Sequence, residues 1–323
     1  MTDKYCLGVD VGSVSTNFVL IDSRKQGVYS SYLRTLGQPI NTVKEGLRQL
    51  GSFLGERQIA AVGVTGSGRN LAAVLLGADV VKNEITAHAV AAGSTCPGVN
   101  TVLEIGGQDS KLIILRQGVV VDFAMNSVCA AGTGSFLDQQ AARLGIPIED
   151  FGSLALQSKN PVRIAGRCSV FAESDMIHKQ QMGNVLPDII AGLCDALVRN
   201  YLNNLAKGKE IKAPVVFQGG VAANAGIKRA FEQALGTEVT VPENYGVMGA
   251  MGAALLARAQ ARDKPTTFLG IGISELSHTS RSFYCSHCAN NCEIVQLACE
   301  DRVLARWGDR CGKWSGLTSK DIG

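Results

Sequence analysis

Short apolar segments alternate with amphipathic ones through most of the chain. Apolar runs bounded by glycine or other turn-forming residues predict strands, at residues 4–11, 18–22, 27–34, 59–65, 111–116 and 119–124 and from Thr101 onward. Segments with helical periodicity predict helices, at residues 42–54, 67–75, 83–92, 136–144 and 184–206. Strands that alternate with helices in this way indicate an α/β fold.

The first strand ends at a turn whose residues suit phosphate binding. Asp10 comes at the end of the strand, and Gly12-Ser13-Val14-Ser15-Thr16 follows as a tight, hydroxyl-rich turn. Such a turn can offer backbone N–H groups and hydroxyls to a phosphate, with Asp10 positioned to hold a hydrated Mg²⁺. Taken by itself, the segment favours an ordinary hairpin turn with an aspartate at its base.

The same arrangement occurs a second time. The strand that begins at Thr101 runs into Glu104-Ile105-Gly106-Gly107-Gln108-Asp109, a Gly-Gly turn with a carboxylate on each side. Two strand–turn–strand units, each with its own aspartate, can bind a phosphate chain from two sides. The repeat is therefore more informative than either copy alone.

A third glycine turn follows a later strand. Val215-Val216-Phe217-Gln218 leads into Gly219-Gly220, and Asn224 stands at the next helix start. Pro242-Glu243-Asn244 and a glycine-containing segment up to Gly249 then precede an Ala-rich helix that runs to about Arg262. Glycine at such turns lets the backbone approach a ligand closely.

Together these segments span most of residues 5–260 and resemble the nucleotide-binding segments of the acetate kinase, sugar kinase, Hsp70 and actin superfamily of ATPases. The resemblance implies a duplicated actin-like (ribonuclease H-like) α/β fold whose two halves close on Mg²⁺ and ATP/ADP. It implies that Asp10, Asp109 and Glu104 lie near the metal and the attacking water. Many relatives carry a lysine near the phosphates where this chain has Asn17, which we expect to weaken or alter those contacts. The implied phosphate-contacting residues are Gly12, Ser13, Ser15, Thr16, Gly106, Gly107 and Gln108, and the implied nucleoside-contacting residues are Gly219, Gly220, Asn224, Glu243 and Gly249.

Composition affects the interpretation of the 10 cysteines. The net charge of +3 over 323 residues gives no support to a nucleic-acid partner, and no apolar stretch reaches the 18 residues of a membrane span. Met1-Thr2-Asp3-Lys4 leads straight into a strand-like run without the features of a signal peptide, so we expect a cytoplasmic location. In a reducing compartment, clustered cysteines favour metal binding or redox chemistry over disulfides.

Two cysteines stand at predicted helix starts, which suggests a metal centre. Cys129 precedes Ala130-Ala131-Gly132-Thr133-Gly134, and Cys168 precedes Ser169-Val170-Phe171-Ala172-Glu173. These segments resemble the ATP-dependent activators of 2-hydroxyacyl-CoA dehydratases and benzoyl-CoA reductases, whose relatives include reductases of double-cubane-cluster proteins. In that family each chain supplies two cysteines to one 4Fe-4S cluster shared across a homodimer, which implies those roles for Cys129 and Cys168. Helix N-termini would supply N–H donors to such an anionic cluster.

The other cysteines divide into two groups. Cys6, Cys96 and Cys194 are expected to be inert buried thiols. The C-terminal region has ligand spacing for zinc or a second iron–sulfur cluster, with Cys311 favoured over Cys299 as the fourth ligand. The expected ligands in this region are Cys285, Cys288, Cys292 and Cys311.

The composition changes after about Asp263, which predicts two parts. Residues 1–263 form the ATPase core in two lobes, and residues 264–323 form a linker and a small Cys-rich, metal-binding extension. Residues 315–323 resemble an unfinished linker, so we expect that the chain is the start of a longer, multi-domain protein.

The resulting hypothesis is an ATP-dependent electron donor. ATP binding and hydrolysis would control low-potential, one-electron transfer from the shared cluster to a dehydratase- or reductase-type iron–sulfur partner, which is a separate protein or a further domain. By resemblance, a ferredoxin or a flavodoxin supplies the electron. Two alternatives stay open: a small-molecule kinase of the same superfamily, and a metal-dependent scaffold or regulator.

Overall fold

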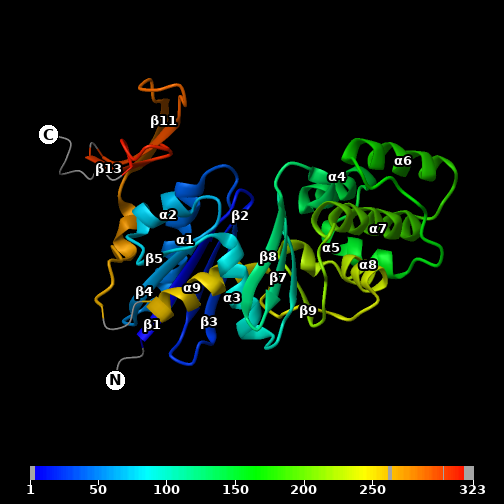
Figure 1. Cartoon of the computed structure of the whole chain (residues 1–323), viewed down its shortest axis with the longest axis horizontal. Helices are drawn as coiled ribbons and strands as arrows, with labels where there is room; N and C mark the ends of the chain where they lie inside the picture. The colour runs from blue at the N-terminus through cyan, green and yellow to red at the C-terminus, as the bar shows by residue number, and fades with distance from the viewer. Residues whose placement is uncertain (1–3, 261–263, 301, 316–323) are drawn as a thin grey trace. The chain divides into compact units, whose positions relative to one another are not determined.

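The computed structural model describes residues 4–260, 264–300 and 302–315 of the chain. The chain folds into two units, of which the first combines residues 1–84 with 249–323 and the second contains residues 85–248 (Figure 1). The expected boundary at Asp263 and most of the expected terminal linker lie outside the described residues. None of the described helices has the length and apolar character needed to cross a bilayer.

The first unit is built on a five-stranded sheet with the order β3-β2-β1-β4-β5. Strands β1, β2 and β3 form an antiparallel meander, and β4 pairs parallel with β1. Leu7, Phe18 and Leu47 are fully buried in its core, because the strands and the inner face of α1 are apolar. The elements of this part are β1 (Lys4–Val11), β2 (Ser15–Ile21), β3 (Gly27–Arg34), α1 (Pro39–Leu54), β4 (Gln58–Thr65), α2 (Arg69–Leu76), β5 (Val80–Val81), α3 (Glu84–Thr95), which crosses into the second unit, and α9 (Met248–Gln260).

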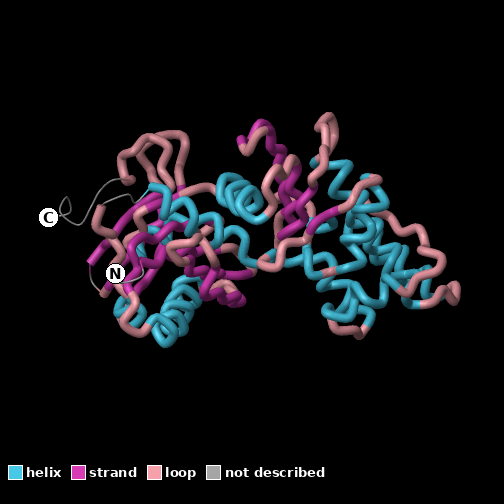
Figure 2. The backbone as a smooth tube through the Cα atoms, turned by 90° about the horizontal axis from the view of Figure 1, so that it is seen from below, coloured by secondary structure: helices cyan, strands magenta, loops and turns pink. Residues whose placement is uncertain are grey.

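The second unit repeats this topology. Its sheet has the order β10-β9-β6-β7-β8, with β6, β7 and β8 antiparallel and β9 parallel to β6 (Figure 2 shows strands in magenta). The predicted duplication of an α/β unit is therefore confirmed. The elements are β6 (Thr101–Ile105), β7 (Ser110–Arg116), β8 (Val119–Asn126), α4 (Gly134–Leu144), α5 (Ile148–Leu156), α6 (Ser169–Gln181), α7 (Leu186–Leu205), β9 (Val215–Gln218), α8 (Ala225–Leu235) and β10 (Val239–Thr240).

Helix α9 packs closely on the sheet of the first unit at three glycines. A Cβ atom at Gly8 on β1 would lie 1.9 Å from the Ala250 carbonyl oxygen, and one at Gly63 on β4 would lie 2.1 Å from the Ala253 carbonyl oxygen. No side chain fits at these distances, so glycine in both strands allows the helix to lie directly on the sheet. Gly249 has the same function at the start of the helix, beside Asp10.

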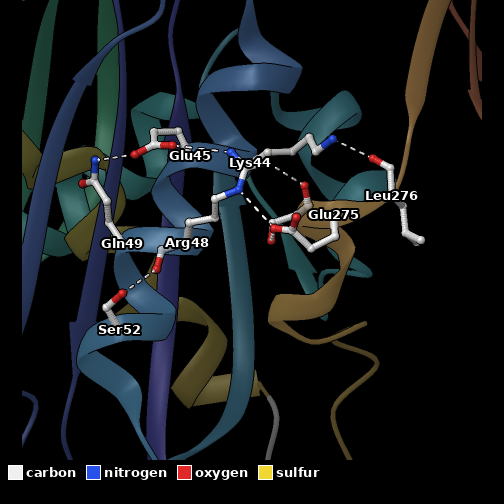
Figure 3. A network of polar contacts seen from close by, with 8 residues as sticks. Lys44, Glu45, Arg48, Gln49, Ser52, Glu275 and Leu276 are labelled. Carbon is white, nitrogen blue, oxygen red and sulfur yellow. Dashed lines mark hydrogen bonds and ion pairs between the residues drawn. The ribbon is translucent and has the colours of Figure 1, made fainter.

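The Cys-rich extension forms a three-stranded antiparallel sheet that packs on the first unit. Leu297 is fully buried in the same core cluster as Leu7 and Leu47, and Trp307 packs against that cluster. The segment that leads into the sheet is held on α1, where Lys44 donates to the Leu276 carbonyl at 2.6 Å and Arg48 bonds to Glu275 (Figure 3). The strands are β11 (His278–Tyr284), β12 (Glu293–Cys299) and β13 (Arg302–Trp307).

Candidate nucleotide-binding loops and cysteine pair

The first glycine turn is a tight hairpin between β1 and β2. The Gly12 amide donates to the Ser15 carbonyl at 2.8 Å, and the Thr35 hydroxyl donates to the Gly12 carbonyl at 3.0 Å. Thr16 is fully buried, and its hydroxyl lies 3.0 Å from that of Thr35. The exposed Ser13 and the partly exposed Ser15 therefore present the accessible hydroxyls of this turn.

Asp10 lies at the end of β1 between two glycines. A Cβ atom at Gly249 would be 2.0 Å from one Asp10 carboxylate oxygen, and a Cβ atom at Gly66 would be 2.5 Å from the other. Gly249 is a predicted site residue, and the structure brings it to the predicted catalytic carboxylate. Gly66 was not predicted, although the Thr65-Gly66-Ser67-Gly68 sequence after β4 is a turn signal of the same kind as the others.

The second glycine turn is built around a buried lysine. Lys111 is only 3% exposed, and its ammonium lies 2.8 Å from an Asp109 oxygen and 3.1 Å from a Glu104 oxygen. The Gly106 amide donates to the Asp109 carbonyl at 3.0 Å and closes the turn. The two predicted carboxylates are thus brought together by one ammonium group, which holds them at the end of the sheet.

The third glycine turn packs directly against the second. Gly219 has φ of +91°, and a Cβ atom there would lie 2.4 Å from the Ile105 carbonyl and 2.8 Å from a Glu104 carboxylate oxygen. The positive φ and the lack of room for a Cβ atom both require glycine at this position. Asn224 caps α8 by accepting from the Ile227 amide at 3.1 Å, whereas Gly220 and Glu243 are exposed.

A buried histidine lies behind the third turn. The Gln218 side chain lies 2.8 Å from Nδ1 of His88, and both residues are buried. Burial, with a smaller contribution from the charge on Lys111, lowers the pKa of His88 to about 3. His88 is therefore neutral at physiological pH, and it was not predicted as part of this region.

Cys129 and Cys168 lie close together in the second unit, and each precedes a helical turn. Cys129 caps the short 3-10 turn Ala130–Gly132 before α4, and Cys168 is the N-cap of α6, as predicted. The Asn126 side chain accepts from the Cys129 amide at 2.9 Å and donates to the Cys129 carbonyl at 2.9 Å, which fixes this peptide. The Cys129 sulfur lies 3.9 Å from both the Arg167 carbonyl and the Asn200 side-chain amide.

The cysteine segment is hydrogen-bonded to the second glycine turn. At the start of α4, the Gly134 amide donates to the Gly106 carbonyl at 2.9 Å and the Ser135 amide to the Gly107 carbonyl at 2.8 Å. The Ser135 hydroxyl adds a third bond to the Gly107 carbonyl at 2.6 Å. A displacement of the Gly106–Asp109 turn would therefore be transmitted to the start of α4, five residues after Cys129.

Cys285, Cys288 and Cys292 lie in the turn between β11 and β12, whereas Cys299 ends β12 and Cys311 follows β13. The Cys285 amide donates to the Cys292 carbonyl at 2.8 Å, while Cys288 and Cys311 are exposed. Within residues 4–260, 264–300 and 302–315, no three His, Cys, Asp or Glu side chains are grouped closely enough to hold a metal ion. Of the three thiols expected to be buried, Cys6 and Cys194 are buried, and burial raises the pKa of Cys194. Cys96 is partly exposed, so the expectation is wrong for this residue.

Comparison with known proteins assigns the nucleotide loops and the cysteine segments to one family. Residues 7–257 match the BadF/BadG/BcrA/BcrD ATPase family. The chain belongs to this family. The match includes all three glycine turns, Cys129 and Cys168, and it ends before the Cys-rich extension. The chain is accordingly an ATPase with the fold of the actin-like ATPases.

Two activators of dehydratases are similar to this chain over nearly their whole length. The (R)-2-hydroxyglutaryl-CoA dehydratase activating ATPase of Acidaminococcus fermentans is 36% identical over 80% of this chain and 98% of that protein. The 2-hydroxyisocaproyl-CoA dehydratase activator of Clostridioides difficile is 34% identical over 80% of this chain and 97% of that protein. A solved structure of the activator of 2-hydroxyisocaproyl-CoA dehydratase from Clostridium difficile, with bound ADPNP, has a TM-score of 0.73 and 33% identity, covering 80% of this chain and 96% of that one.

Proposed function

We propose that this ATPase is a reductive activator, which uses ATP binding and hydrolysis to drive electron transfer to a partner metalloenzyme. The observation that carries the proposal is the set of hydrogen bonds between the Gly106–Asp109 turn and the start of α4. They connect a predicted phosphate-binding turn directly to the segment that bears Cys129. The names of the two relatives, both activators of dehydratases, support the same role.

The geometry of each turn supports a proposed role for its nucleotide-binding residues. We assign Asp10, Asp109 and Glu104 to Mg²⁺ and the attacking water, since carboxylate oxygens are preferred ligands of Mg²⁺. Lys111 holds the last two carboxylates in place. The backbone amides of the first two turns, with the hydroxyls of Ser13 and Ser15, suit phosphate oxygens. The backbone of Gly219 and Gly220 suits the nucleoside.

The cysteine pair fits half of a four-thiolate site. A 4Fe-4S cluster, when bound, supplies a one-electron carrier of low potential. Cys129 and Cys168 are both partly exposed, and both begin helical segments whose first N–H groups favour negative charge. The Asn200 side-chain amide lies 3.9 Å from the Cys129 sulfur, where it can donate to the sulfur of a cluster ligand. The residues present therefore fit two of the four ligands.

We infer that a second copy of the chain supplies the other two thiolates. Val128, next to Cys129, is 96% exposed, and Val170, two residues after Cys168, is 66% exposed. Apolar side chains that are this exposed on both sides of the pair suit a surface that a second copy covers. A twofold axis through the site would bring together two equivalent pairs and complete the ligand set.

The remaining assignments follow from the relatives and from the sequence. The partner would be a dehydratase- or reductase-type iron–sulfur protein or domain, and the electron donor a ferredoxin or flavodoxin. Cys285, Cys288, Cys292 and Cys311 would hold a zinc ion or a second cluster after a rearrangement of the turn between β11 and β12, since the described residues form no such group.

The test is iron and sulfide analysis of protein purified without oxygen. The four proposed ligands of the extension, Cys285, Cys288, Cys292 and Cys311, are first changed to serine, so that only the core contributes iron. Cys129→Ser and Cys168→Ser should each reduce the iron content to less than about a tenth of that background, whereas the control Cys96→Ser should not change it. Light scattering should give a dimer for the iron-loaded protein. Unchanged iron content in both variants would exclude the proposed ligands.

A further inference from the structure

A large, open cavity lies in the second unit beside Cys168. Its volume is about 690 Å³, and it is lined by the segment that precedes Cys168, by α6 and by α7. Arg167, one of its lining residues, is the neighbour of Cys168 in the chain, and its carbonyl lies 3.9 Å from the Cys129 sulfur. The cavity therefore opens next to the cysteine pair.

The cavity is strongly basic. Arg163, Arg167, Lys179 and Arg199 contribute four positive charges, and Asp175 contributes the single negative charge among the lining residues. The formal net charge of the lining, counted over its Lys, Arg, Asp and Glu side chains, is therefore +3.

The structure leaves most of these charges available to a ligand. Asp175 is engaged with the backbone, since it accepts from the Ala165 amide at 2.8 Å. Arg199 donates to the Ile164 carbonyl at 2.6 Å, which holds the cavity wall on α7. Across the part of the chain that the structure describes, Arg163, Arg167 and Lys179 form no ion pair with an acidic side chain.

The exposure of the lining favours a protein ligand over a small molecule. Sites for small molecules are mostly apolar and enclose their ligand, whereas Arg163, Arg167 and His178 are exposed and the cavity is open. Phe171 adds an aromatic ring that is 66% exposed to the same lining. Exposed arginine and aromatic side chains together are typical of protein interfaces.

We propose that this cavity is the docking site of an acidic electron-carrier protein that reduces the Cys129–Cys168 centre. The proposal rests on the proposed function. One electron passes from the reduced carrier to the centre, so the carrier is oxidised and the centre reduced by one electron, with no proton transferred. A small, charged and accessible surface suits this role, because a carrier that is exchanged after each electron makes brief encounters that opposite charges accelerate.

The test compares two reductants of the iron-loaded, full-length protein by stopped-flow spectroscopy at low ionic strength. The first is a purified ferredoxin with a strongly acidic surface, and the second is reduced methyl viologen, a small cation. Arg163→Glu and Lys179→Glu should each lower the second-order rate constant with ferredoxin by at least about tenfold, since steering by charge contributes roughly 10- to 1,000-fold to association rates. Lys207→Glu makes the same charge change outside the cavity and should lower the rate less than about threefold. Methyl viologen should reduce all four proteins at similar rates.

Each other outcome decides a different point. If methyl viologen cannot reduce the wild-type protein, the proposed function itself fails. If it reduces every protein, but ferredoxin reduces the cavity variants as fast as Lys207→Glu, the docking site is refuted. If light scattering shows that the cavity variants have a different oligomeric state, the cavity is a contact between copies of the chain, and the proposed docking site is overturned. A further result would also refute the docking site. If the variants leave the ferredoxin rate unaltered, and calorimetry shows that the wild type binds inorganic phosphate while Arg163→Glu does not, the cavity is a site for small anions.

Discussion

Lys111 is the residue on which the arrangement of the second glycine turn depends most directly. Its side chain is almost fully buried on β7 and reaches two carboxylates, Glu104 on β6 and Asp109 in the turn. A buried ammonium is costly unless negative charge surrounds it, and the same holds for the buried Glu104 carboxylate. The three groups therefore hold each other in position.

Removing the ammonium should destabilise the second unit. Lys111→Met removes the ammonium from beside the buried Glu104 carboxylate, and breaking a buried ion pair costs about 3–5 kcal/mol of unfolding free energy. Urea unfolding followed by circular dichroism measures this loss. Glu104→Gln combined with Lys111→Met should recover part of it, because both charges are then gone. Lys209→Met, which breaks the exposed pair with Asp122, serves as the control with a much smaller effect. Equal effects of the two single variants would contradict the proposed dependence on burial.

The buried His88 predicts a loss of stability in mild acid. Its pKa is about 3 in the folded protein, against about 6.5 in an unfolded chain, so the unfolded state takes up the proton first as the pH falls. The stability from the neutral ring is fully present above pH 6.5 and is lost below it. Between pH 7 and pH 5 the loss is about 2 kcal/mol.

His88→Asn isolates this contribution to the pH dependence. The asparagine oxygen can accept from Gln218 near the place of Nδ1, but it has no proton to gain. Urea unfolding at several pH values should show that the stability of the wild type falls about 2 kcal/mol more steeply from pH 7 to pH 5 than that of the variant. Parallel profiles would mean that His88 is not responsible.

Single residues were predictable from the sequence where a local pattern marks them. Asp10, Asp109, Cys129 and Cys168 each stand next to a glycine turn or a helix start, and the structure places them there. Lys111 was missed because a lysine within a strand is usually read as an exposed side chain. Only the pairing of β6 with β7, which puts Lys111 opposite Glu104, reveals its role. Which residues pair across two strands cannot be predicted from the residues next to them in the sequence.

At the scale of elements, the packing of α9 on the first sheet determines the position of Asp10. The helix begins beside the end of β1, and the absence of a side chain at Gly249 leaves room for the Asp10 carboxylate. Gly8 and Gly63 allow the rest of the helix to lie close to the sheet. The position of a whole helix thus determines where the proposed catalytic carboxylate of Asp10 can lie.

A methyl group at Gly249 should therefore impair ATP hydrolysis. In Gly249→Ala the new carbon would overlap an Asp10 oxygen at 2.0 Å, so either the carboxylate or the helix start must move. A misplacement of about 1 Å at a catalytic group can cost up to about 100-fold in rate, so we expect kcat to fall by about 10- to 100-fold. Gly272→Ala is the control, since no atom lies within 4 Å of its added carbon. A normal kcat for Gly249→Ala, measured by phosphate release, would show that Asp10 does not need this position.

Whole elements were predicted well wherever the apolar pattern is long and regular. The predicted strands at 4–11 and 27–34 coincide with β1 and β3, and the helix predicted at 184–206 corresponds to α7 at Leu186–Leu205. The three strands of the extension were not predicted, because their exposed faces carry polar residues and their cysteines suggested a metal-held loop. The sheet becomes apparent only through its packing on another part of the chain.

At the scale of the whole molecule, the duplication explains why two glycine turns with aspartates recur. Both sheets have an antiparallel meander followed by a parallel strand, and in both the first turn of the meander carries the candidate phosphate-binding residues. This repeat was predicted from the two glycine turns in the sequence. The sequence did not predict that the chain leaves the first unit after residue 84 and returns to it at residue 249, because α9 is apolar on many sides and gives no sign of which sheet it covers.

The return of the chain also makes the extension part of the first unit. Leu297 on β12 is fully buried in the core that contains Leu7 and Leu47, so the extension and the first sheet share one hydrophobic cluster. Burial of a leucine in such a cluster contributes about 2–5 kcal/mol when measured by truncation to alanine. Cutting off the extension would expose this core, which is why cysteine variants rather than truncation test the metal sites.

We therefore predict that the extension and the first unit unfold together. Both tryptophans of the chain, Trp307 and Trp314, lie in the extension, so their fluorescence reports its unfolding, while circular dichroism at 222 nm reports the helices. Leu297→Ala should lower the urea midpoint of the fluorescence transition and of a helical transition that coincides with it. Leu269→Ala, at a leucine that is 58% exposed, should leave both nearly unchanged. A fluorescence transition that comes well before any loss of helix, in the wild type and in Leu297→Ala, would show instead that the extension folds as an independent part of the protein.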